Sequence, residues 1–153
     1  MNNIKYFFQF FFIIMMFFIF KIIGFKYSSF IGGKLFQVIG PFFRSKKVIH
    51  SNIKRVFPNI NPKSLKKITD SMWENYGRVF AEYMFIKDFR NDQLSNNITI
   101  EGKEILDEIR EKNLKAIFIS GHFSNFELMA MQIEKSGINL AAIYRPLNNI
   151  FLN

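Results

Sequence analysis

The chain contains no cysteine, which excludes disulfide bonds, thiolate metal sites and a cysteine nucleophile. It has only two histidines, His50 and His122, so a histidine-rich metal site is not expected and we predict no bound metal. The sequence also lacks a zinc-finger, helix-turn-helix or RNA-recognition pattern. We therefore expect no nucleic-acid partner.

Acidic residues are scarce between residues 26 and 72, where Asp70 alone stands against ten Lys and Arg residues. This segment accounts for the whole formal net charge of +9, because the charges of the two flanking segments cancel. The basic segment directly follows an apolar one. That order favours an anionic membrane surface as the partner of this part of the chain.

Phenylalanine is over-represented, with 21 copies, of which 13 precede residue 44. From Tyr6 to Phe20 only Gln9 interrupts the apolar run, and the run continues to Phe25. As a helix, the twenty residues from Tyr6 to Phe25 span about 30 Å, which is the thickness of a bilayer hydrocarbon core. We predict a transmembrane anchor over residues 1–25. A cleaved signal peptide is the alternative, but Lys5 is the only early positive charge and no A-x-A-like cleavage site follows.

The Lys and Arg excess on the C-terminal side of this run predicts a single-pass protein with residues 26–153 in the cytoplasm. Residues 26–90 are predicted to form basic, membrane-proximal helices. Within them, residues 28–43 are apolar but short and glycine-rich. They are compatible with an interfacial or re-entrant helix and equally with a core helix of the soluble part.

Two helices are expected in the rest of this segment. Residues 44–57 place apolar side chains at helical spacing. A second helix is predicted to begin with Asn61 as N-cap and Pro62 as its first residue, and to end near residue 86. Gly77 lies inside it and indicates a close approach to another helix.

Residues 91–153 show a different pattern, in which short β-rich runs alternate with amphipathic helices. Such alternation is typical of a parallel α/β sheet, and we predict the start of an α/β domain here. The expected strands are 98–100, 115–120 and 140–144, and the expected helices are 101–112 and 124–135.

A polar cluster, residues 121–127, lies between the second expected strand and the following helix, where open α/β sheets bind ligands. His122 is suited to accept a proton near neutral pH, and the carboxylate of Glu127 could orient it. The alternative is structural: Ser124-Asn125-Phe126-Glu127 also fits an S-x-x-E capping box, in which Glu127 only closes the helix N-terminus. The local pattern does not separate the two interpretations.

Four short segments, in order, resemble the lipid A late acyltransferases, the lauroyl/myristoyl acyltransferase family. The segment ISGHFSNFELMA resembles the family's His-x4-Asp/Glu box, and Tyr144 to Asn149 resembles its Y-R-P-x-x-N segment. Ile100-Glu101-Gly102 with the helix after it resembles the strand and helix before the box. His50 to Pro58 resembles an N-terminal Asn…Phe-Pro segment.

The resemblance implies a glycerolipid-acyltransferase-like α/β fold in the bacterial inner membrane. It implies transfer of an acyl chain from acyl carrier protein to a hydroxyl of a lipid A precursor, within lipopolysaccharide biosynthesis. His122 would be the general base and Glu127 its orienting partner, Arg145 would contact a phosphate, and Asn148 would position that loop. No cofactor is implied beyond the thioester donor.

The sequence departs from the family in two ways. Ser124-Asn125-Phe126 stands where Gly-Asn-Trp is more common, and the chain stops at Asn153, before further strands of the family. We therefore expect an N-terminal portion with an incomplete, truncated sheet. The alternatives are an acyltransferase for another glycolipid or a lysophospholipid, and a membrane-anchored fragment or interaction module without activity.

Overall fold

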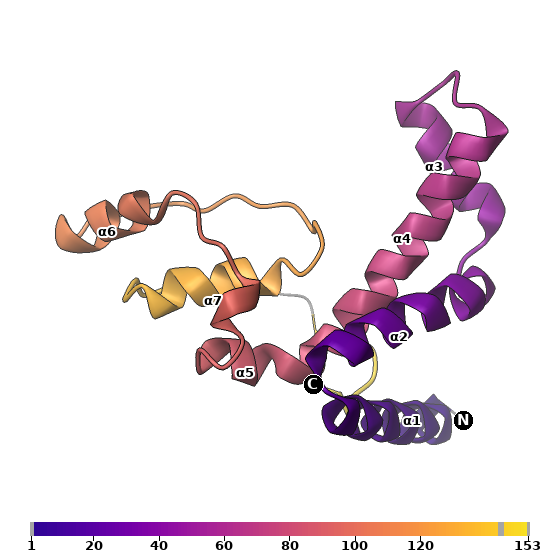
Figure 1. Cartoon of the computed structure of the whole chain (residues 1–153), viewed down its shortest axis with the longest axis horizontal. Coiled ribbons are helices and arrows are strands. Elements are labelled where there is room, and N and C mark those ends of the chain that lie inside the picture. Colours follow the sequence, from indigo (N-terminus) through magenta and orange to yellow (C-terminus); the bar gives the residue numbers. More distant parts are fainter. Residues whose placement is uncertain (1, 144–145, 153) are drawn as a thin grey trace. The chain divides into compact units, whose positions relative to one another are not determined.

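The computed structural model describes residues 2–143 and 146–152, and the regular elements in those ranges are helices (Figure 1). The described residues form two compact units, Ile19–Met84 and a second made of Met1–Phe18 with Phe85–Asn153. The predicted division into residues 1–25, 26–90 and 91–153 stays a prediction. In chain order the elements are α1 (Asn2–Ile23), α2 (Phe25–Ile39), η1 (Gly40–Phe42), α3 (Lys46–Val56), α4 (Pro62–Glu82), η2 (Tyr83–Phe85), α5 (Ile86–Arg90), η3 (Ser95–Asn97), α6 (Lys103–Glu111) and α7 (Glu127–Lys135).

The predicted parallel α/β sheet is wrong, because the structure is helical and contains no strand in residues 2–143 and 146–152. In the expected buried strand, Ile117 and Ile119 are 90% and 93% exposed. Residues 114–118 and 138–141 border one cavity of about 460 Å³, so these expected strands lie near each other without regular pairing. A strand is stable only when its backbone groups pair with a neighbour, and the pattern of one segment does not specify that neighbour.

The helices α2 and α4 pack together and form the core of the unit Ile19–Met84. Ser28, Ser29, Gly32 and Gly33 are the buried residues of α2, so α2 is the core helix that the sequence allowed for residues 28–43. A Cβ built on Gly77 of α4 would lie 2.1 Å from the carbonyl oxygen of Gly32. Only glycine allows two helix backbones to approach this closely. The close contact predicted at Gly77 is confirmed.

The start of α4 also agrees with its predicted cap. Asn61 is the N-cap, its side-chain oxygen accepts a hydrogen bond from the Ser64 backbone N–H at 2.8 Å, and Pro62 follows as the first helical residue. The cap satisfies one backbone donor that would otherwise lack a partner, and proline removes another. The helix ends at Glu82, a few residues before the predicted end.

A polar network joins α2 and α4 along one side of their interface. Glu74 of α4 pairs with Arg78 at 2.7 Å and with Lys34 of α2 at 3.3 Å, and it accepts a hydrogen bond from Gln37 at 2.8 Å. The Arg78 hydrogen bond, followed by the Lys34 hydrogen bond, holds the pKa of the Glu74 carboxyl below its ordinary value. The charged form of Glu74 therefore stabilises the folded unit.

Glu74→Gln is expected to lower the thermal stability of the protein at neutral pH and to have a shrinking effect in acid. Because the folded-state pKa of Glu74 is depressed, its stabilisation is present above the unfolded-state pKa, about 4.3, and is lost as pH falls through the folded-state value. Melting temperatures of both proteins, followed by circular dichroism between pH 7 and pH 3, measure this. A difference that stays constant over the whole range would contradict the account.

In the second unit, two ion pairs join α7 to α5 and to the residues that directly follow α5. Arg90 pairs with Glu134 at 2.6 Å, and Lys135 pairs with Asp92 at 2.6 Å. Arg110 of α6 donates a hydrogen bond to the backbone oxygen of Ser136 at 3.3 Å. These contacts hold α5, α6 and the C-terminal end of α7 together. The N-terminal end of α7, where the polar cluster lies, makes none of them.

The helix α1 has the length and composition of a membrane span from Ile4 to Ile23, with a mean hydropathy of 2.2. Its apolar side chains are largely exposed, including Phe8, Phe12 and Phe18 at 66%, 59% and 67%. A helix that is apolar on all sides and exposed lacks the polar face of a helix on a soluble domain. The apolar N-terminal helix of the sequence analysis is therefore present.

Candidate active site

The polar cluster of residues 121–127 forms a loop that leads into α7. Residues 121–126 have no regular secondary structure, and α7 begins at Glu127, three residues later than the sequence indicated. His122 is thus in the loop and Glu127 is the first residue of the helix. This is the arrangement that the pair requires, since residues five apart on one helix point in different directions.

The imidazole of His122 is exposed and stacks on the ring of Phe126, with a centroid distance of 4.3 Å and an interplanar angle of 5°. No hydrogen bond or ion pair of His122 is formed in the described part of the chain, including one to Glu127. The stack nevertheless places the imidazole against the residue that directly precedes Glu127. Both nitrogens of the ring are left available to a substrate.

Glu127 is partly buried, and its carboxylate lies in the first turn of α7, where a negative charge is favourable. The N-cap of α7 is Phe126, whose side chain makes no cap hydrogen bond. Ser124, which would be the N-cap of a capping box, lies two residues earlier with a positive φ of 47°. The structure therefore places Phe126 rather than Ser124 at the N-cap of α7, and the choice between a catalytic and a capping Glu127 stays a prediction.

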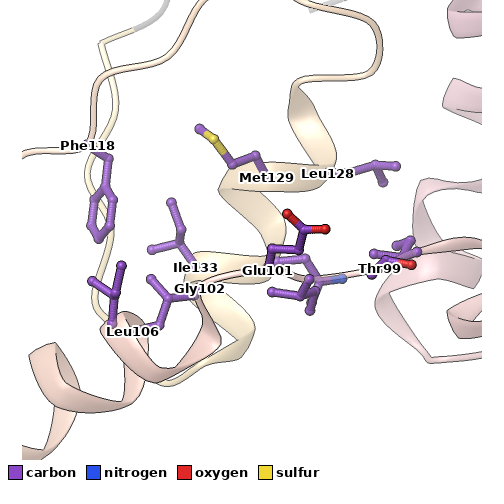
Figure 2. A pocket seen from close by; sticks show the side chains of 12 residues that line it. Thr99, Glu101, Gly102, Leu106, Phe118, Leu128, Met129 and Ile133 are labelled. Carbon is purple, nitrogen blue, oxygen red and sulfur yellow. The ribbon is translucent and has the colours of Figure 1, made fainter.

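An apolar cavity of about 450 Å³ lies beside α7 (Figure 2). Leu128, Met129 and Ile133 of α7 line one part of it, and Leu106 of α6 and Phe118 line another. Glu101 is the one charged residue among the side chains that line it. Leu128 follows Glu127 directly, so the cavity begins one residue from the predicted site. An apolar cavity of this volume can hold the hydrocarbon part of a small ligand.

The two other predicted site residues are less informative. Arg145 lies outside the described residues. Asn148 is exposed. Their roles stay predictions.

The structure draws attention to Asn149, which sequence reasoning missed. Its side chain is 7% exposed, donates to the backbone oxygen of Tyr6 at 3.0 Å and accepts from the Phe151 backbone N–H at 3.0 Å. Counting along Tyr144-Arg145-Pro146-Leu147-Asn148-Asn149 places Asn149, rather than Asn148, at the final position of a Y-R-P-x-x-N segment. That register was the signal that could have identified it.

The described residues contain no group of three His, Asp or Glu side chains arranged to hold a metal ion. The chemistry that the exposed imidazole of His122 can offer without a metal is proton transfer, and Glu127 and the apolar cavity follow it along the chain.

A comparison with protein families agrees with this class of chemistry. The family described as bacterial lipid A biosynthesis acyltransferase matches residues 1–153, a match to the N-terminal portion of the family. The chain belongs to this acyltransferase family. No curated protein and no solved structure matches the chain.

Proposed function

We propose that this protein transfers a fatty acyl chain from an acyl carrier protein thioester to a hydroxyl group of a lipid A precursor. The observation that carries the proposal is the family match over residues 1–153. It is supported by an exposed His122 in the loop before α7 and by an apolar cavity whose lining begins at Leu128, the residue after Glu127. No cofactor is needed beyond the donor thioester.

In the proposed reaction, His122 removes the proton of the acceptor hydroxyl as its oxygen attacks the thioester carbonyl carbon. A carbon–oxygen bond forms, the carbon–sulfur bond breaks, and the proton passes from His122 to the leaving thiolate. Glu127 orients the imidazole and stabilises its cationic form once a substrate closes the loop. Direct transfer requires no acyl-enzyme, in keeping with a chain that has no cysteine.

The cavity beside α7 is the proposed place for the acyl chain. Its lining is hydrocarbon from Leu106, Phe118 and Ile133, so burial of methylene groups there is favourable by about 0.8 kcal/mol each. Arg145 would contact a phosphate of the acceptor or of the donor arm, as guanidinium groups do, and Asn148 would position that loop.

We further propose that α1 is a single-pass anchor in the inner membrane and that residues 26–153 lie in the cytoplasm. The apolar window from Ile4 to Ile23 and the basic segment after it support this orientation. A cytoplasmic acyl carrier protein could then reach the site. The basic helices would also face two acidic partners, the carrier protein and the membrane surface.

The hydrogen bond from Asn149 to Tyr6 bears on this orientation. In a spanning α1, Tyr6 and Phe25 are separated by about 30 Å of helix, so Asn149 cannot contact Tyr6 from the cytoplasm. The proposal requires this contact to open in the membrane. Its loss leaves no orphan acceptor on α1, because the Tyr6 carbonyl also accepts within the helix.

Cysteine labelling tests the orientation with no background, since the chain has no cysteine of its own. In right-side-out vesicles, a membrane-impermeant maleimide is expected to modify the Lys5→Cys variant and to leave Ser51→Cys unmodified. Inverted vesicles should give the opposite pattern. Labelling of both variants from the same side would overturn the proposed span.

The reaction is tested with membranes that contain the protein, radiolabelled acyl carrier protein thioester, and equimolar lipid A precursor and lysophospholipid. We expect the label to appear in the lipid A precursor. Preferential labelling of the lysophospholipid would instead support an acyltransferase with another acceptor. Absence of transfer to either lipid would contradict the proposed activity.

A further inference from the structure

The unit Ile19–Met84 contains a cavity of about 660 Å³ between α2, α3 and α4, remote in sequence from the loop of His122. Phe36 of α2, Ile49 and Ile53 of α3, and Val79 of α4 are among the apolar side chains that line it. Its volume falls within the range of about 300–1,000 Å³ that is typical of small-ligand sites. The acyl transfer proposed above does not use this cavity.

One basic side chain, Arg44, lines this cavity. The residues of α3 that line it are Val48, Ile49, Asn52 and Ile53, whereas Lys47, Lys54 and Arg55 line a separate hollow on the opposite face of that helix. Within the described ranges, the side chain of Arg44 forms no ion pair or hydrogen bond with the protein. Its positive charge is therefore available to an anionic ligand.

One residue that lines the cavity has a buried polar atom without a partner in the described part of the chain. Trp73 of α4 lines the cavity and is 8% exposed, and its Nε1 has no hydrogen-bond acceptor in the part of the chain that the structure describes. A buried donor left unsatisfied destabilises the folded state, and an oxygen atom of a bound ligand would remove that cost.

We propose that this cavity binds one acyl chain of an anionic phospholipid of the surrounding bilayer, with the lipid phosphate held by Arg44. An apolar interior with an exposed arginine beside it complements a molecule with a hydrocarbon tail below an anionic head. A phospholipid also has ester oxygens that Trp73 Nε1 can donate to. The C-terminal turn of the apolar α1, from Ile19 to Ile23, is part of this unit, and a membrane-spanning α1 would bring the cavity to a membrane surface.

Trp73 is the only tryptophan of the protein and serves as the probe. The whole protein is reconstituted in vesicles of phosphatidylcholine that contain a small fraction of either phosphatidylglycerol or phosphatidylcholine with dibrominated acyl chains. Bromine quenches tryptophan fluorescence on contact. We expect brominated phosphatidylglycerol to quench Trp73 more strongly than brominated phosphatidylcholine at the same mole fraction.

Two matched variants of α3 separate binding in the cavity from general contact with lipid. Val48 lines the cavity, whereas Val56 is an exposed residue of the same helix that does not. Val48→Phe should fill the cavity and remove the preferential quenching, and Val56→Phe should leave it unchanged. Circular dichroism and the emission maximum of Trp73 confirm that both variants are folded.

Arg44→Gln tests the lipid headgroup without altering the buried lining, because Arg44 is exposed. Loss of one cation next to an anionic lipid should weaken the preference for phosphatidylglycerol by about fivefold. Equal quenching by the two brominated lipids, or equal effects of Val48→Phe and Val56→Phe, would overturn the proposal. Neither result depends on whether the protein transfers acyl groups.

Discussion

Replacement of His122 by alanine is expected to lower the rate of acyl transfer by about 10²–10⁴-fold, the usual contribution of a general base. The acceptor hydroxyl is a poor nucleophile until its proton is removed, and the imidazole of His122 is the exposed base at the start of α7. The assay is transfer of labelled acyl chains to the lipid A precursor by membranes that contain equal amounts of each protein.

The same substitution should leave the fold intact. His122 lies in a loop, is exposed, and contacts the described residues through its stack on Phe126. His50, the other histidine, lies in α3, and His50→Ala provides the matched control. We expect His50→Ala to transfer at the rate of the unaltered protein. A His122→Ala protein with near-normal turnover would remove His122 from the mechanism.

Gly77→Val is expected to destabilise the protein by about 1–3 kcal/mol, the usual cost of overpacking a closely packed interface. A Cβ at position 77 would lie 2.1 Å from the Gly32 carbonyl oxygen and 2.7 Å from the Phe36 Cβ. Backbone cannot yield as a flexible side chain does, so α2 and α4 must move apart. Ala81, which is fully buried in α4, would then be exposed together with Trp73.

Thermal unfolding followed by circular dichroism measures this loss, and a red shift of Trp73 emission reports that the helices have separated. Ser71→Val is the control, because Ser71 is an exposed residue of the same helix and its substitution should change stability by less than about 0.5 kcal/mol. Equal melting temperatures for the two valine variants would show that the glycine contact between α2 and α4 contributes nothing to stability.

The helices of this protein were predictable because their signals are local. Asn61 and Pro62 define the start of α4 through the hydrogen bond to Ser64 and the missing proline N–H, both within one turn. Gly77 could be recognised as a contact, although its partner Gly32 could not be identified from the pattern alone. The boundaries of α3 and α6 were each predicted to within two residues.

The sequence wrongly predicted a sheet, and the described residues contain no strand. Strand pairing depends on segments distant in the sequence, which a local pattern does not identify. Residues 115–120 have the composition of a buried strand, yet Ile117 and Ile119 are almost fully exposed in the structure. A run rich in β-branched residues indicates a propensity for strand pairing, but it does not identify the segment with which it would pair. The same composition is therefore found in an unpaired segment.

The candidate site contains features that the sequence predicted and others that it did not. The loop position of His122 and the helical position of Glu127 followed from the sequence, since the helix pattern begins near residue 124. The stack of His122 on Phe126 did not, because aromatic contacts within a loop depend on its backbone conformation, including the positive φ of Ser124. The buried Asn149 was missed for a different reason, an error of one position in the register of its segment.

The most direct test of the central claim is a double-mutant cycle of acyl-transfer rates with His122→Ala, Glu127→Ala and the double variant, in the same membrane assay. If Glu127 acts through His122, Glu127→Ala slows transfer, and adding it to His122→Ala causes little further loss, because residues that act as a unit are not additive. Losses that multiply in the double variant, or a Glu127→Ala protein as fast as the unaltered one, would contradict the His122–Glu127 pair.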